Sequence, residues 1–464
     1  MKRLNQIIYL LAIIVTTSIG CKKDFLNAKP RTTIVAPTNL KDLEMLLENS
    51  DVLTSNTPGL TIMGSDEYVF IDYSNWQSAF TATERNSYIW AKDIFNGEIN
   101  IQDWNDGYKA IFYCNNVLET ISTIDRSKSD IALYDTVKGW ALFARAYILY
   151  DLVSTFSPAY DASTSSSDLG VPIRLKPGID EILQRSSVKD TYNQILTDLD
   201  EAKKLLSASM PINRNRPSKS AAYALFSRIY LSMREYNLAE NYADSTLQLY
   251  NKLIDYNTIS KTSTGPFPIN CDEAIYINGA VASPYGIINP FNGNTAITVN
   301  PELIRLYEIS DLRLNIFFKT NATTGNLYFN RSYYPVVRAF TGLATDEIYL
   351  IKAECLARRN QVPSAMTTLN TLLKMRFSPT DYRDLTASDQ TDALNKVLLE
   401  RRKELVWRAL RWYDLRRLNN EGADITLTRV LDGITYTLPP NDPRYVFPIP
   451  DDEITRSGIQ QNIR

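Results

Sequence analysis

The chain has 464 residues and a net charge of −2, from 50 Lys and Arg against 52 Asp and Glu, so it lacks a basic field that would attract nucleic acid. It contains no histidine, which excludes Ser-His-Asp and Cys-His catalysis, His-ligated zinc and imidazole acid–base chemistry. A content of 44% hydrophobic and 22% charged residues is typical of a globular protein.

The chain begins with the features of a bacterial signal peptide. Lys2 and Arg3 precede an apolar run at 7–15, which is about half the length that a membrane-spanning helix needs. Then come the four residues SIGC, which resemble a lipobox, with Cys21 in the place of the cysteine that receives lipid. We expect residues 1–20 to be removed and Cys21 to be lipidated, since several acyl chains anchor a protein stably. Ordinary cleavage beside an unmodified cysteine is the alternative.

A loop-rich insertion is predicted at 50–99. Aromatic residues stand there among polar ones, in the stretch SDEYVFIDYSNWQSAFTATERNSYIW. Tyr and Trp offer an apolar face with a polar tip, which suits a wet binding surface as well as packing. Binding residues also concentrate on loops that a rigid scaffold holds. We expect Trp90, which lies next to the helical region, to be more structural than Trp76.

The middle of the chain predicts helices in pairs. Apolar residues recur at helical spacing over 104–121, 136–156, 188–206, 218–232 and 237–250. Ser187 stands three residues before Asp190 and predicts a capping-box start for the third of these helices.

Two of the predicted hairpins share a pattern of small residues. Ser227 precedes Ala239 by twelve residues, and Ala353 precedes Ala365 by the same interval. This spacing resembles that of tetratricopeptide repeats, in which each helix of a hairpin needs a small side chain at the crossing. We therefore expect a mostly α fold with a tetratricopeptide-like helical scaffold.

A second loop-rich insertion is predicted at 256–335. Four prolines between positions 266 and 290 leave few places for regular helices, and the stretch SPYGIINPFNGNT presents Tyr285 and Asn292. Apart from Cys21, the chain has three cysteines, which cannot form a four-cysteine zinc site. Cys114 and Cys355 lie inside apolar helical patterns, so we expect buried, unreactive thiols there.

The segment from Glu400 to Arg417, ERRKELVWRALRWYDLRR, predicts part of one long helix over 391–419 with a wide apolar face. Glu404 precedes Arg408 by four residues, the better orientation for a helical ion pair. Asp414 can reach Arg411 or Arg417 at a spacing of three. These residues therefore predict packing and ion pairs, and no chemistry.

Two prolines near the C-terminus, in Val446-Phe447-Pro448-Ile449-Pro450, predict an extended run across the surface of the fold. The chain then closes with Gln460-Gln461-Asn462. This ending and the run E-R-R-x-E-L…R-W-x-D-L-R-R are similar to signatures of the SusD/RagB family. The resemblance covers essentially the whole mature chain.

The resemblance implies a single SusD-like domain over 21–464, with a helical repeat core at about 104–250 and 346–419. It implies an outer-membrane lipoprotein that faces the cell exterior, binds an oligo- or polysaccharide and passes it to a SusC-like TonB-dependent transporter. In such glycan binders, aromatic residues from loops outside the repeats form the binding surface. The candidate ligand residues are Asp66, Tyr73, Asn75, Trp76, Tyr285 and Asn292.

Other functions remain open at this point. A RagB-like member would bind peptide, through backbone partners and fewer stacking rings. A surface glycoside hydrolase would need two carboxyl groups roughly 5–10 Å apart across a sugar, and nothing in the sequence singles out such a pair. A scaffold without a small ligand would have its loop aromatics buried. The chain has no phosphate-binding loop and no G-x-G-x-x-G, so we expect no enzyme, no cofactor and no metal.

Overall fold

The computed structural model describes residues 37–464 apart from 179, 282, 290–294, 331 and 335–336. The signal peptide, Cys21 and Asn292 lie outside the described residues. The described helices and strands all belong to the unit Asn39–Arg464. No helix within the described part is both long enough and apolar enough to cross a membrane.

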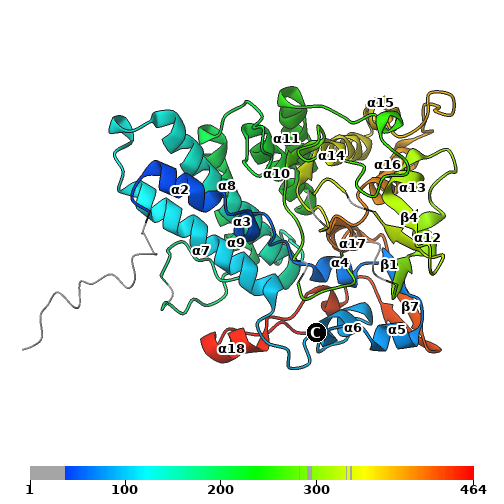
Figure 1. Cartoon of the computed structure of the whole chain (residues 1–464), viewed down its shortest axis with the longest axis horizontal. Coiled ribbons are helices and arrows are strands. Elements are labelled where there is room, and N and C mark those ends of the chain that lie inside the picture. Colours follow the sequence, from blue (N-terminus) through cyan, green and yellow to red (C-terminus); the bar gives the residue numbers. More distant parts are fainter. Residues whose placement is uncertain (1–36, 179, 282, 290–294, 331, 335–336) are drawn as a thin grey trace, which may run out of the picture. The chain divides into compact units, whose positions relative to one another are not determined.

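The scaffold consists of helices that pair with their neighbours along the chain (Figure 1). Helix α7 packs against α8, α8 against α9, α10 against α11, and α14 against α15. The bounds are α7 Gln102–Ser122, α8 Ile131–Phe156, α9 Val188–Leu205, α10 Lys219–Ser232, α11 Tyr236–Leu249, α14 Thr345–Arg358 and α15 Val362–Leu373. The predicted mostly helical fold and its helix pairs are confirmed.

Local sequence explains where these helices start and how closely they approach. The Ser187 hydroxyl accepts the backbone N–H of Asp190 at 3.0 Å, so the predicted cap of α9 is present. Ser227 on α10 is buried and its Oγ donates to the carbonyl of Ala239 on α11 at 2.9 Å. Both Ala353 and Ala365 are also fully buried. Small side chains therefore stand at both hairpin crossings, as predicted.

The two insertions consist of short elements that meet in a small sheet. The first contains α3 Ser50–Leu53, α4 Leu60–Gly64, β1 Tyr68–Phe70, α5 Tyr73–Gln77 and α6 Ala82–Tyr88, after α2 Leu40–Leu47. The second contains β2 Ala274–Tyr276, β3 Ile297–Val299, α12 Pro301–Ile304, α13 Leu312–Phe317, β4 Phe318–Thr320 and β5 Leu327–Phe329, before β6 Leu343–Ala344. β1 pairs with β3 in antiparallel register, with Tyr68 opposite Val299. Within the described residues, short 3-10 helices span Arg126–Lys128, Tyr256–Thr258 and Pro443–Tyr445.

The predicted single helix over 391–419 is wrong. The chain forms α16 Gln390–Glu404 and α17 Leu410–Asn419, and between them Trp407 and Ala409 adopt positive φ angles of 62°. Consequently Glu404 and Arg408 do not pair. Glu404 accepts hydrogen bonds from Arg376 and Arg313, while Arg408 binds another carboxylate, described below. Buried partners from distant segments outweigh the local i,i+4 pair.

The C-terminal segment is extended, as predicted, but it is not on the surface. It follows the hairpin of β7 Leu427–Leu431 and β8 Ile434–Leu438 and precedes α18 Asp451–Ser457. Phe447 and Ile449 are buried, and the backbone N–H of Phe447 donates to the carbonyl of Thr155 at 3.2 Å. The segment therefore forms part of the core around α8.

Candidate ligand-binding surface

Helix α5 is the exposed part of the first insertion, and its start is set by Asp72. One carboxylate oxygen of Asp72 accepts the backbone N–H of Asn75 and the hydroxyl of Ser74, both at 2.8 Å. Both hydrogen bonds lower the pKa of the Asp72 carboxyl, and the bond from the Asn75 N–H has the larger effect. A five-residue helix is too short to be stable alone, so this cap fixes the direction in which its side chains project.

Two of the predicted ligand residues stack on each other along α5. The ring centroids of Tyr73 and Trp76 are 5.4 Å apart and their planes are inclined by 28°. Trp76 is half-buried, and its indole N–H donates to the carbonyl of Arg85 at 3.0 Å. Tyr73 is 38% exposed and Asn75 is half-exposed. The structure thus brings Tyr73, Asn75 and Trp76 together on one short helix.

A further exposed ring follows this helix. Phe80, three residues beyond the end of α5, is 81% exposed. Phe80 is not among the predicted ligand residues, although a signal was present: it lies between Ala79 and Thr81 and belongs to no apolar helical pattern. Single exposed apolar side chains are common on proteins, so it is the position of Phe80 beside α5 that makes it a candidate.

Asp66 has a different role from the predicted one. Its carboxylate forms a two-pronged ion pair with Arg411, with both N–O distances at 2.9 Å, and it also contacts Arg402 at 2.9 Å. Burial alone would raise the pKa of Asp66, but the two arginine charges outweigh burial and hold it well below its usual range. Because both oxygens are engaged, Asp66 joins the insertion to α17, and this geometry argues against ligand contact.

Tyr285 lies in the interior. It is 2% exposed, and its hydroxyl donates to Asp103 at 2.6 Å. The other oxygen of Asp103 accepts the backbone N–H of Leu60 at 3.1 Å, and burial raises the pKa of Asp103 to about 6. The Tyr285 ring is therefore covered and packs the second insertion against α7. Asn292, seven residues later, lies outside the described residues.

The insertion that carries α5 is held by buried contacts. The indole N–H of Trp90 donates to the carbonyl of Gly64 at 2.9 Å, so Trp90 is structural, as expected. The Arg429 guanidinium from β7 lies over the rings of Tyr88 and Trp90, 4.0 and 4.6 Å from their centroids. The exposed rings of α5 thus stand on a fixed base.

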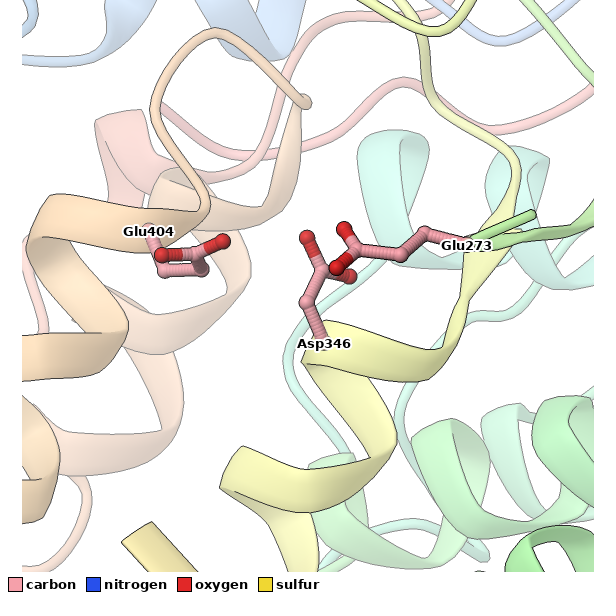
Figure 2. A group of neighbouring side chains, drawn as sticks. All are labelled: Glu273, Asp346 and Glu404. Atoms are coloured by element: carbon pink, nitrogen blue, oxygen red, sulfur yellow. The ribbon is translucent and has the colours of Figure 1, made fainter. Parts of the chain in front are cut away.

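Three buried carboxylates meet in the core (Figure 2). Glu273 directly precedes β2, Asp346 lies in α14 and Glu404 ends α16, and each has a carboxylate oxygen within 4.8 Å of the others. Such a group could hold a cation, but arginines already engage it. Arg376 contacts Glu273 at 2.9 Å and Glu404 at 2.7 Å, and Arg408 forms two bonds with Asp346. We therefore interpret the cluster as an ion-pair network of the core.

The cysteines are also part of the core. Cys114, Cys271 and Cys355 are all free and buried. Burial raises the pKa of both the Cys114 and Cys271 thiols to about 12, and it raises that of Cys355 further. The thiolate that reacts or binds metal is accordingly disfavoured at all three positions.

Two family models match the chain, one over its first half and one from within the second insertion onward. The model described as "Starch-binding associating with outer membrane" matches residues 24–231, and the model described as "SusD family" matches residues 300–463. The chain belongs to the SusD/RagB family. Proteins of this family are non-catalytic binding proteins, and the family is associated with the outer membrane.

Individual SusD-like proteins agree with this assignment. SusD-like protein P2 of Formosa agariphila is 24% identical over 371 residues, which are 68% of this chain and 71% of that protein. A SusD superfamily protein from Bacteroides thetaiotaomicron is 22% identical with a TM-score of 0.73, covering 92% of this chain and 100% of that one. A protein described as a putative sugar binding protein, from Bacteroides vulgatus, also gives 22% and 0.73, covering 92% and 99%. These structures show that the fold is SusD-like.

Proposed function

We propose that this SusD-like protein captures glycan chains at the cell surface through the rings carried by α5 and the turn that follows it. The stacked pair of Tyr73 and Trp76 is the observation that carries the proposal. It agrees with the family description of starch binding and with the sugar-binding description of the Bacteroides vulgatus protein. The capture involves no chemical step.

The ring geometry assigns different roles to the two residues. Because Tyr73 and Trp76 stack, one face of each ring is covered by the other. Trp76 is also fixed through its indole N–H, whereas Tyr73 is the more open ring. We infer that the C–H face of a sugar lies against the outer face of Tyr73, with Trp76 as its support. Sugar-binding surfaces of this kind combine apolar platforms with a few polar groups.

Neighbouring residues extend this platform. Phe80 offers a second exposed ring for an adjacent sugar unit. Asn75 lies between the stacked residues in the sequence and is half-exposed, so its amide is the proposed partner for sugar hydroxyls. The proposed site does not include Asp66, because arginine engages its carboxylate. It does not include Tyr285, because that side chain is buried.

We further propose that Cys21 carries the lipid anchor and that a SusC-like TonB-dependent transporter receives the ligand. The lipobox-like SIGC sequence supports the anchor, and membership of an outer-membrane-associated family supports the location. Replacement of Cys21 by Ala should move the protein from the membrane fraction to the soluble fraction. Recovery of the transporter with the wild-type protein after mild detergent extraction would support the partnership, and its absence would count against it.

The test of glycan capture is native affinity electrophoresis of residues 22–464 in gels that contain one polysaccharide each. Wild type runs beside Tyr73→Ala and Phe80→Ala, and beside Phe112→Ala as a control. Phe112 lies on α7 and is 39% exposed, almost the same as Tyr73, but it belongs to the helical scaffold. We expect Tyr73→Ala to weaken retardation by at least about tenfold, equivalent to about 1.4 kcal/mol, and Phe112→Ala to leave it unchanged.

Two results would change the proposed function. Equal weakening by Tyr73→Ala and Phe112→Ala would mean that retardation does not depend on α5. Absence of retardation in every gel, combined with binding of a peptide library, would favour the RagB-like peptide role.

A further inference from the structure

A cavity lies on another part of the molecule. An open cavity of about 590 Å³ is bounded by the loop after α8, at 158–169, and by the C-terminal segment at 441–463. This volume is within the range of roughly 300–1,000 Å³ that is usual for small-molecule sites. None of its lining residues belongs to α5 or to the turn with Phe80. It is therefore separate from the surface proposed above.

The loop wall of the cavity is preorganised. Asp161 pairs with Arg234 at 2.6 Å and accepts the backbone N–H of Ser163 at 2.9 Å. Asp168 accepts the hydroxyl of Thr164 at 2.6 Å, and its own carbonyl accepts the N–H of Val188 at 2.8 Å. A ligand that entered here would not have to order the loop, which lowers the entropic cost of binding.

The opposite wall is equally fixed. The side-chain amide of Gln461 both accepts from and donates to the backbone of Ile449, each at 2.8 Å. The Asn462 amide donates to the carbonyls of Phe156 and Phe447, also at 2.8 Å. The cavity is consequently framed by side chains that other contacts already hold in place.

Two buried polar groups that line the cavity are incompletely used by the protein. Tyr445 is 4% exposed, and its hydroxyl has no hydrogen-bond partner within the described part of the chain. Arg416 is 6% exposed and donates to the carbonyls of Ser154 and Ser157. Among the described residues it contacts no carboxylate, and burial lowers its pKa. The Tyr445 hydroxyl is itself covered, so of the two groups only the Arg416 guanidinium is a candidate partner for a ligand in the cavity.

We propose that this cavity binds a small polyhydroxylated molecule, either a free sugar or one terminal unit of a glycan. Arg416 offers a donor and Asp168 an acceptor, and the exposed side chains of Thr164, Asn420 and Gln460 offer further polar groups. Apolar residues of the lining, including Pro158, Leu169 and Val446, suit the C–H groups of such a ligand. Three lining carboxylates against one lining arginine disfavour a strongly anionic ligand such as a phosphate.

The structure provides a reporter for each of the two sites. The indole N–H of Trp412 donates to the carbonyl of Tyr445 at 3.1 Å, and their ring centroids are 4.8 Å apart. Trp412 is buried directly behind the cavity wall, whereas Trp76 lies on α5. The chain has six tryptophans, so 5-fluorotryptophan labelling gives a simple ¹⁹F spectrum. Trp76→Phe and Trp412→Phe assign the two resonances.

The experiment titrates residues 22–464 with glucose, galactose, mannose and xylose, and separately with the corresponding disaccharides, up to their solubility limits. We expect at least one probe to shift the Trp412 resonance along a saturating curve. Asn420→Ala removes an exposed amide of the cavity lining, so it should leave the melting temperature unchanged and weaken binding about 3- to 10-fold. Asn241→Ala is the matched control, because Asn241 is also exposed but does not line the cavity.

The outcomes separate this proposal from the capture function. A shift of Trp412 with monosaccharides identifies a free sugar as the ligand, and a shift with disaccharides alone identifies a glycan end. A shift of Trp76 without Trp412 supports capture at α5 and overturns the second site. A Trp412 titration curve that Asn420→Ala leaves unchanged, or no Trp412 shift with any probe, likewise overturns it.

Discussion

Arg408 and Asp346 form a two-pronged ion pair that is buried in the core. The N–O distances are 2.9 and 2.6 Å, and the guanidinium also lies 4.6 Å from the centroid of the Tyr333 ring. Asp346 stands in the first turn of α14, and Arg408 in the break between α16 and α17. The pair therefore joins the segment between α16 and α17 to helix α14 of the scaffold.

Removal of one member of this pair should be strongly destabilising. Arg408→Met leaves the Asp346 carboxylate buried without its main partner, and we expect a loss of about 3–5 kcal/mol in the free energy of unfolding. The double variant Arg408→Met/Asp346→Leu removes both charges and should recover most of that loss. Urea unfolding of the wild type, Arg408→Met, Asp346→Leu and the double variant measures both effects. A double variant as unstable as the single one would show that the charges are not the cause.

The buried Asp151 should make stability fall as pH rises. Its carboxylate accepts a bond from Thr57 at 2.5 Å, and burial raises its pKa to about 7. Between about pH 4 and pH 7 the unfolded chain has released this proton while the folded chain retains it. The unfolded state then binds fewer protons, so the free energy of unfolding decreases over this window, by up to about 4 kcal/mol.

Asp151→Asn should remove this contribution to the pH dependence. Urea unfolding at pH 4.5 and at pH 8 measures this contribution. The control is Asp424→Asn, because Asp424 is exposed and its replacement should leave the wild-type pH dependence intact. An unchanged slope in Asp151→Asn would mean that Asp151 is ionised in the folded protein across the window.

The crossing of α10 and α11 should not tolerate a large side chain. Ala239 is fully buried, and its carbonyl accepts the hydroxyl of Ser227. Ala239→Leu should separate the helices and cost about 1–3 kcal/mol. Asn241→Leu introduces the same side chain at an exposed position of α11 and should have little effect. Thermal melts of both variants distinguish crowding at the crossing from a general effect of added leucine.

The three core thiols should be unreactive in the folded protein. Burial raises the pKa of each, as described for Cys114, Cys271 and Cys355. A chain that begins at residue 22 should release almost no chromophore with a disulfide reagent under native conditions, and should titrate all three thiols in denaturant. One fast-reacting thiol in the native protein would reveal local opening around that residue.

Local patterns predicted the helices well because the relevant interactions are close in sequence. The Ser187 cap acts over three residues, and the small residues Ser227 and Ala239 lie within one hairpin. The break at Trp407 and Ala409 could not be predicted in this way. The i,i+4 spacing of Glu404 and Arg408 favoured a continuous helix, whereas their true partners, Arg376 and Asp346, come from other segments.

At the candidate site, too, local sequence predicted some features and missed the contacts between distant segments. Tyr73 and Trp76 were predicted together because both lie on one short polar segment, and the structure stacks their rings. Their contact with a ligand stays a prediction. Asp66 and Tyr285 have equally suitable side chains, but Arg411 and Asp103 engage them from distant positions. No local signal distinguishes an aspartate that awaits a ligand from one that an arginine already holds.

The ion pair between Asp66 and Arg411 joins residues 345 positions apart. Trp407 likewise donates its backbone N–H to Glu67, 340 positions earlier. The base beneath α5 is therefore completed only when the last part of the chain has been synthesised. Loop closure over such a separation is entropically costly and slow. A chain truncated before Trp407 should leave the aromatic platform unformed, so the binding surface is among the last parts of the protein to mature.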